Sequence, residues 1–151
     1  MVDIRSIDFE IIKEPWNKYQ ISDGSVLRTR TILKKVERVM DGNKVSFNVD
    51  GQTLTVVHAD AALRGTPNNR PVTKDEMLKS IDKDDMRYDT LAQEFNEYIL
   101  DDGTKIKIYT NVIKISRLKL YDIRGDPMYL VDSSNTMEIK PSSQYKTPPP
   151  K

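Results

Sequence analysis

The sequence predicts an all-β protein, mainly β with one short helix, made of an internal duplication of a five-stranded small-barrel or sandwich unit with long bent strands. Three observations predict this fold: short runs in which apolar and polar residues alternate, a recurring Asp-Gly dipeptide, and self-similarity along the chain. The chain has 151 residues, of which 37% are hydrophobic, and this is enough for a modest core. Wholesale disorder is therefore excluded.

The self-similarity has one clear register. Residues 6–38 align with residues 85–117 without a gap at an offset of 79, and seven positions are identical where chance gives about two. The identical pairs are Asn17 and Asn96, Tyr19 and Tyr98, Asp23 and Asp102, Gly24 and Gly103, Thr31 and Thr110, Lys35 and Lys114, and Arg38 and Arg117. Further along, the offset becomes 82, as if the second copy had a longer connection.

This register divides the chain into four parts. We predict a first β repeat at residues 1–58, a linker of loop and short helix at 59–84, a second β repeat at 85–140 and a disordered tail at 141–151.

Each repeat is expected to contain about five strands. The first run alternates from Ile7, and Pro15 interrupts it before a second strand. Asp23-Gly24 and Asp102-Gly103 then predict matching hairpin turns, because glycine readily takes the positive φ that such turns need.

The remaining strands are predicted from the strand face on which apolar residues lie and from residues typical of turns. The long strand at 105–118 changes the face that carries its apolar residues partway along, which predicts a bulge or sharp bend. The long strand at 26–39 allows the same change, so we expect both strands to bend. Two closing hairpins are expected, one with its turn at Asp50-Gly51 and one at Ser133-Ser134.

The predicted helix lies between the repeats. Thr73 is placed as its N-cap, Glu76 completes a capping box, and the helix should run from Lys74 to about Ile81.

Residue types missing from the chain exclude much chemistry. There is no cysteine and only one histidine, His58, so thiolate sites and sites with several imidazoles within one chain are excluded. The acidic run at 82–85 lacks the glycine of a calcium loop. We therefore expect no enzyme, no catalytic residues, no cofactor and no metal site.

The charges are segregated although the net charge is only +1. Two basic segments, at 28–44 and 105–124, flank an acidic block at 74–102. The candidate basic binding face consists of Arg28, Arg30, Lys35, Arg38, Lys105, Lys107, Lys114 and Arg117. We place Lys105 and Lys107 at sites equivalent to Arg28 and Arg30. Such a face either binds a partner or is a solvated strand surface.

A repeated aromatic-Asn-x-Tyr element, at Trp16 to Tyr19 and Phe95 to Tyr98, is the other candidate platform. We interpret its aromatic residues as core plugs.

These observations predict a non-enzymatic protein-protein interaction module in the cytoplasm, and complementary charge would let it self-associate. The partner is then another protein or a second copy of the chain. The alternative is weak nucleic-acid binding by the basic strand faces, although the near-neutral charge favours it less. No apolar run is long enough for a membrane span, so no membrane partner is expected.

Overall fold

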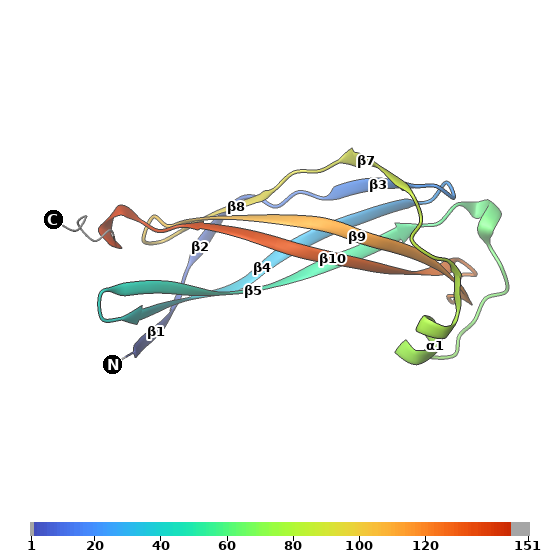
Figure 1. Ribbon diagram of the computed structural model, residues 1–151, viewed down its shortest axis with the longest axis horizontal. Helices are drawn as coiled ribbons and strands as arrows, with labels where there is room; N and C mark the ends of the chain where they lie inside the picture. The colour runs from blue at the N-terminus through green and yellow to red at the C-terminus, as the bar shows by residue number, and fades with distance from the viewer. Residues whose placement is uncertain (1, 146–151) are drawn as a thin grey trace.

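The computed structural model describes residues 2–145, which form a mainly β, elongated molecule with two antiparallel sheets (Figure 1). Sheet A contains β1 (Val2–Ile7), β3 (Asn17–Ile21), β4 (Val26–Asp41), β5 (Lys44–His58) and β7 (Tyr88–Ala92). Sheet B contains β2 (Phe9–Lys13), β6 (Ile81–Lys83), β8 (Asn96–Leu100), β9 (Lys105–Tyr121) and β10 (Pro127–Lys140). Strand pairing among these residues closes neither sheet into a barrel.

The two sheets share one strand order. In sheet A, β4 pairs with β5 along one edge and with β1 and β3 along the other, and β7 follows β3. In sheet B, β9 takes the place of β4, with β10, β6, β8 and β2 in the corresponding places. Each sheet therefore receives one strand from the other half of the chain, because β2 lies in sheet B and β7 in sheet A. The sheets do not coincide with the two predicted repeats.

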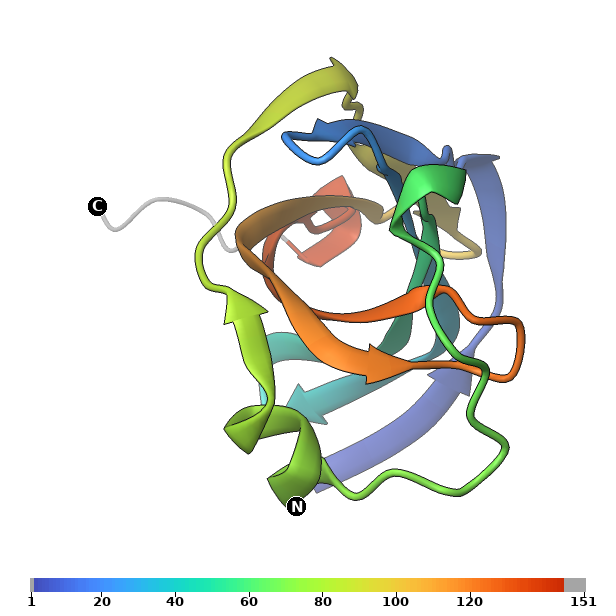
Figure 2. The ribbon, with the colours of Figure 1, turned by 90° about the vertical axis from the view of Figure 1, so that its right-hand side faces the viewer.

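The core consists of two clusters, and each cluster takes side chains from both halves of the chain. One contains Leu33 and Val36 of β4 together with Tyr98 of β8 and Ile106 of β9. The other contains Tyr19, Ile21, Leu27 and Ile115, and every member of this cluster has a counterpart in the first at an offset of 79 or 82. Viewed from the end that carries the helix, the strands of both sheets surround this interior (Figure 2).

The two predicted Asp-Gly turns are confirmed. Gly24 and Gly103 have φ of +91° and +89°, and each donates its N–H to the carbonyl three residues earlier. The carboxylates of Asp23 and Asp102 each accept a hydrogen bond of 2.9 Å from the backbone N–H two residues on.

The predicted bulges are also present, and they explain why two predicted hairpins are wrong. The pairing of β4 with β5 shifts register between Leu33 and Lys35, and the pairing of β9 with β10 shifts between Asp132 and Ser133. Both β5 and β10 are continuous strands, so neither Asp50-Gly51 nor Ser133-Ser134 is a turn. A Cβ on Gly51 would lie 3.0 Å from the Ile32 carbonyl oxygen. Glycine is therefore placed here for the close approach to the bulge rather than for a turn.

A small polar group joins the halves at the centre of the molecule. The hydroxyl of Thr31 hydrogen-bonds the hydroxyl of its counterpart Thr110, and both threonines are buried. Thr53 of β5 and Asn135 of β10 extend the group, with 3.3 Å between the Asn135 amide nitrogen and the Thr53 hydroxyl. Because buried polar atoms need partners, this group fixes how β4 sits against β9.

The predicted helix is confirmed as α1 (Lys74–Lys79), and Thr73 caps it by accepting the N–H of Glu76 at 3.2 Å. It ends before Ile81, because Ile81 begins β6 and pairs with β9. A short strand therefore lies inside the predicted linker. None of the helices in residues 2–145 has the length and apolar character to cross a membrane.

The start of the predicted tail is structured. Residues Ser143–Tyr145 form a short 3₁₀ helix, while residues 146–151, with the three prolines, lie outside the described part of the chain.

Candidate functional site

The eight residues of the predicted basic face do not form one surface. Arg28, Arg30 and Lys35 belong to β4 in sheet A, and Lys105, Lys107 and Lys114 belong to β9 in sheet B. At an offset of 79 the residue that corresponds to Arg28 is Lys107, while Tyr109 corresponds to Arg30. The bulges also change which face each later residue takes. The set is therefore split between two outer faces and the interior.

Arg38 and Arg117 point inward, to the Asp-Gly turn of the opposite half. The Arg117 guanidinium, whose side chain is 14% exposed, lies 3.3 Å from the Asp23 carboxylate and 3.1 Å from the Asp82 carboxylate. Arg38 donates to the Tyr145 hydroxyl, which donates to the Asp102 carboxylate at 2.6 Å. These two arginines hold the halves together, and this use leaves them unsuited to binding a partner.

The Asp23 carboxylate is nearly buried, and Tyr129 donates to it at 2.6 Å. Burial raises the pKa of this carboxyl, but hydrogen bonds from Tyr129, Ser25 and Arg117 outweigh burial and hold the pKa below its usual range. The pKa of Tyr129 is raised in turn, by burial and by its bond to the carboxylate.

Three of the remaining lysines lie at the surface. Lys114 forms an ion pair of 2.9 Å with Asp84, and Lys35 lies 3.7 Å from Glu37. Part of the predicted charge complementarity is thus satisfied inside one chain, because Asp82 and Asp84 of the acidic block contact Arg117 and Lys114. Lys105 is exposed and faces Lys140 across β9 and β10, near the strand ends.

The outer face of sheet A gathers cations around the single tryptophan. The guanidinium carbons of Arg28 and Arg30 lie 4.7 and 5.8 Å from the centre of the Trp16 ring. Lys18 lies directly opposite Arg28 across β3 and β4, and Val56, which is 41% exposed, lies opposite Arg28 on β5. We call Trp16, Lys18, Arg28, Arg30 and Val56 the tryptophan-arginine surface.

A buried glutamate positions Arg30. The Glu14 side chain is only 4% exposed, and its carboxylate lies 3.3 Å from the Arg30 guanidinium. It also accepts hydrogen bonds from the Tyr98 hydroxyl at 2.7 Å and from the Leu33 N–H at 3.2 Å. Arg28 and Arg30 both have a buried Nε without a hydrogen-bond partner among the described residues. Apart from the Arg30 nitrogen that pairs with Glu14, the outer guanidinium nitrogens of Arg28 and Arg30 have no ion pair within residues 2–145, so they are the groups that can meet an anion.

The corresponding place in sheet B has a different charge pattern. Lys107 takes the position of Arg28, and it lies opposite Glu97 on β8 and Glu138 on β10. These glutamates replace Lys18 and Val56. The Phe95 ring, which replaces Trp16, has the ammonium groups of Lys13 and Lys107 at 3.8 and 4.8 Å from its centre. The same backbone thus carries an unbalanced cation cluster in sheet A and a balanced one in sheet B.

The interpretation of Trp16 and Phe95 as core plugs is wrong. Both are half-buried and lie outside the core clusters, while Tyr19 and Tyr98 are fully buried. The physical reason is parity: each aromatic residue is one position out of phase with the inward-facing residues of the strand that follows.

Sequence reasoning also missed Lys18 and Glu14 as parts of a site. The pairing of Lys18 with Arg28 follows from the turn at Asp23-Gly24, because the turn sets the register of the hairpin. This pairing could therefore have been predicted from the sequence. The contact between Glu14 and Tyr98 joins residues 84 positions apart, and nothing in the sequence indicates it.

The cations around Trp16 give this surface groups that can bind an anion. Within residues 2–145, no three His, Asp or Glu side chains gather closely enough to hold a metal ion. Comparison of this chain with protein families, with curated proteins and with solved structures finds no match.

Proposed function

We propose that this chain is a non-enzymatic protein-protein interaction module, acting in the cytoplasm, whose tryptophan-arginine surface binds an acidic segment of a partner protein. One observation carries the proposal. Lys18 and Arg28 lie directly opposite each other on the outer face of sheet A, and like charges in that position destabilise a sheet. The corresponding pair in sheet B, Glu97 and Lys107, has opposite charges. An anionic ligand removes the repulsion in sheet A and gains two charge-assisted contacts.

The neighbouring side chains indicate which kind of anion fits. Val56 and Leu54 flank the cations on β5, so the surface offers apolar contacts beside charged ones. A segment that carries both carboxylates and apolar side chains matches this arrangement. The Trp16 ring and the Glu14 carboxylate hold the two arginines in place, and this preorganisation lowers the conformational entropy lost on binding.

A nucleic acid is supported less well. A phosphate backbone is bound by a continuous basic track with open aromatic faces for stacking. The basic residues here are divided between two outer faces, and the rings of Trp16 and Phe95 already carry the chain's own cations. Self-association through charge is a special case of the proposal, in which the acidic segment belongs to a second copy.

Fluorescence anisotropy with two labelled probes tests the proposal. One probe is a peptide of alternating glutamate and valine, and the other is a single-stranded DNA of about 20 nucleotides. We expect the peptide to bind at low salt, to weaken as salt is added, and to lose affinity by about tenfold or more when Lys18→Glu and Arg28→Glu are combined.

Lys107→Glu is the matched control, because Lys107 has the same position in sheet B but lies between two glutamates. It should change peptide affinity by less than about twofold. Equal losses in both variants, or no binding of the peptide at low salt, would contradict the proposal. Tighter binding of the DNA with a steep salt dependence would favour the nucleic-acid alternative.

The finer architecture is part of the same proposal: we infer that the two sheets are copies of one duplicated five-stranded unit. Support comes from the strands β2 and β7, whose bounds differ by 79 at both ends. Their pairings with β8 and β3 also match, since Phe9 opposite Leu100 corresponds to Tyr88 opposite Ile21. In such a duplication the outer face of sheet B can keep balanced charges while the outer face of sheet A evolves to bind an anionic ligand.

A further inference from the structure

A second surface lies where the two sheets meet along their free edges. Among the described residues, β5 is hydrogen-bonded only to β4 and β10 only to β9, so each leaves one edge without a partner strand. The two edges run side by side, and the contact between Thr53 and Asn135 bridges them near the middle. Toward the end that carries α1 the strands separate and open a cavity of about 370 Å³. We call this opening, between Thr55 and Val57 of β5 and Tyr129 and Val131 of β10, the edge groove.

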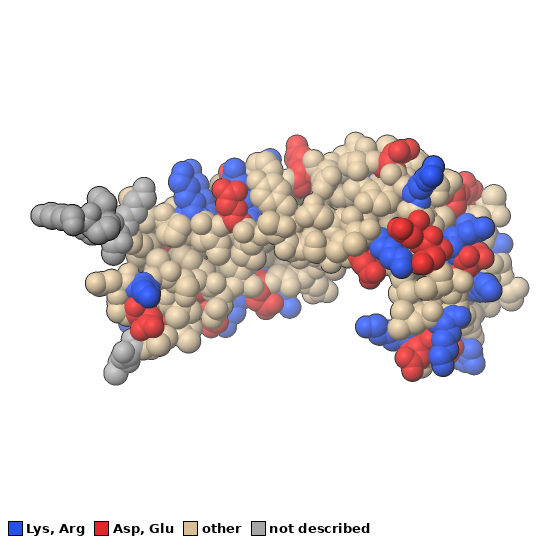
Figure 3. All heavy atoms as spheres, viewed as in Figure 1, with Lys and Arg blue, Asp and Glu red and all other residues tan. Residues whose placement is uncertain are grey.

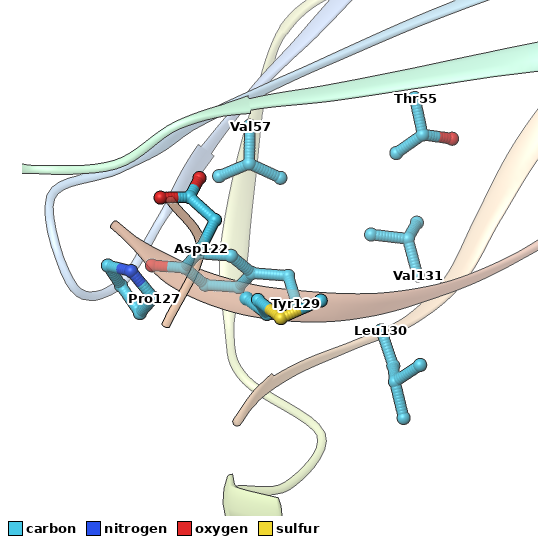
Figure 4. Close-up of a pocket in the computed structure, with 8 residues that line it drawn as sticks. Thr55, Val57, Asp122, Pro127, Tyr129, Leu130 and Val131 are labelled. Carbon is cyan, nitrogen blue, oxygen red and sulfur yellow. The ribbon is translucent and has the colours of Figure 1, made fainter. Parts of the chain in front are cut away.

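The walls of the edge groove are inward-facing side chains that remain partly accessible. Figure 4 shows Thr55 and Val57 on one wall and Val131 on the other, while Leu130 points away. Val57, Tyr129 and Val131 also pack on a core cluster, so the floor of the groove is the core itself. Thr55 is exposed although it occupies an inward position of β5.

One stretch of each edge lacks the usual protection against pairing. Edge strands generally carry charged side chains or proline that deter another strand. Here residues 51–57 of β5 and residues 133–137 of β10 contain no charged residue and no proline, in a chain that is 31% charged. The middle of the face where β9, β10 and β5 lie is likewise mostly uncharged, and charges lie toward the two ends of the molecule, most densely at the end with α1 (Figure 3).

One charge marks the end of the edge groove. Asp122 is the only charged residue among those that line the cavity. One oxygen of its carboxylate accepts the N–H groups of Arg124 and Asp126, and within residues 2–145 no lysine or arginine pairs with it. A ligand with a basic group beside apolar groups is therefore complementary to this lining.

We propose that the edge groove binds a short extended segment of a partner protein, whose main chain pairs with the free edge of β5. Its alternate apolar side chains enter the cavity, and one lysine or arginine lies against Asp122. Strand addition of this kind gains affinity from backbone hydrogen bonds and specificity from alternate side chains. This surface is separate from the tryptophan-arginine surface, and the charge of its ligand is opposite.

A phage-displayed library of eight-residue peptides, selected on the full chain, tests this proposal. We expect enriched peptides to alternate apolar residues with polar ones and to carry a lysine or arginine near one end. Labelled copies should shift the amide signals of Thr55, Val57 and Val131 in NMR spectra, because these three residues line the edge groove, and they should leave the signals of Lys18 and Arg28 unchanged.

Two variants should leave the fold intact and remove the complementarity between the edge groove and its peptide. Thr55→Lys places a charge at an exposed position of the groove, and Asp122→Asn keeps an oxygen for the backbone turn but removes the negative charge. Each should weaken the selected peptides by about tenfold or more. Met137→Lys is the matched control, because Met137 is the counterpart of Thr55, is 40% exposed and lies at the far end of β10.

The outcomes separate this proposal from the preceding one. The proposal is overturned if no peptide is enriched, if enriched peptides lack alternation and a basic residue, or if Thr55→Lys and Asp122→Asn bind them as well as the unaltered chain does. Neither variant touches Lys18 or Arg28, so binding of the acidic peptide there should remain unchanged.

Discussion

Replacing Tyr129 by phenylalanine removes one hydroxyl from the contact that joins β10 to the first Asp-Gly turn. That hydroxyl donates to the Asp23 carboxylate at 2.6 Å and lies 3.0 Å from the Ser25 hydroxyl. The ring itself should be tolerated, because the counterpart of Tyr129 in β5 is Phe47, which packs on the other core cluster. A hydrogen bond to a buried charged group contributes about 1.5–3 kcal/mol. We therefore expect Tyr129→Phe to lower the free energy of unfolding by about 2 kcal/mol at pH 7.

The same change should alter how stability depends on pH. The pKa of Asp23 is lowered in the folded protein, so its contribution is complete above the pKa of the unfolded chain, about 4, and is lost as pH falls through the lower folded value. In Tyr129→Phe the folded pKa lies closer to the unfolded one, and less stability is lost in acid. The difference between the two proteins should therefore shrink between pH 5 and about pH 3.

Urea unfolding at several pH values measures both effects, and a thermal melt should show a drop in Tm of about 4–8 °C at pH 7. A loss below about 0.5 kcal/mol, or a loss that is the same at pH 7 and pH 3, would show that the Tyr129 hydroxyl does not stabilise the ionised Asp23 carboxylate. Tyr145→Phe is the parallel case, because Tyr145 donates to Asp102 at the corresponding turn.

Three further predictions concern local structure. Gly24→Ala and Gly103→Ala should each lower the free energy of unfolding by about 1 kcal/mol or more, because both glycines have positive φ. Urea unfolding should show a larger loss for Gly24→Ala, because the new Cβ would lie 2.5 Å from the Asp60 carboxylate. Thr73→Ala should cost about 1 kcal/mol, seen as weaker amide protection confined to the helix, and unchanged protection would argue against the cap. Glu14→Gln should lower stability by about 1–3 kcal/mol and weaken binding of the acidic peptide, whereas normal affinity would show that Glu14 does not position Arg30.

Local features of the fold were predictable from the sequence because their causes are local. The Asp-Gly turns, the cap at Thr73 and the bulges each depend on a few neighbouring residues. The turn predicted at Asp50-Gly51 failed for the opposite reason. Gly51 is required by the carbonyl of Ile32 on the neighbouring strand, and a single segment does not contain that constraint.

The exchange of β2 and β7 could not be predicted, because it depends on where strands pair rather than on where they form. Phe9 is apolar and begins a strand in either arrangement, but only the structure shows that it pairs with Leu100. The way the two halves of the chain contact each other also divides the predicted basic face. Arg38 and Arg117 reach the turns of the opposite half, and the remaining cations are left on two outer faces.

NMR titration of the full chain with the acidic peptide compares the two sheets within one molecule, and it therefore tests whether the outer face of sheet A is the binding site. We expect the amide signals to move at Lys18, Arg28 and Val56 and to stay unchanged at their counterparts Glu97, Lys107 and Glu138. Signals that move equally on both sheets, or that move on neither, would contradict the claim that the unbalanced cation cluster of sheet A is the binding site.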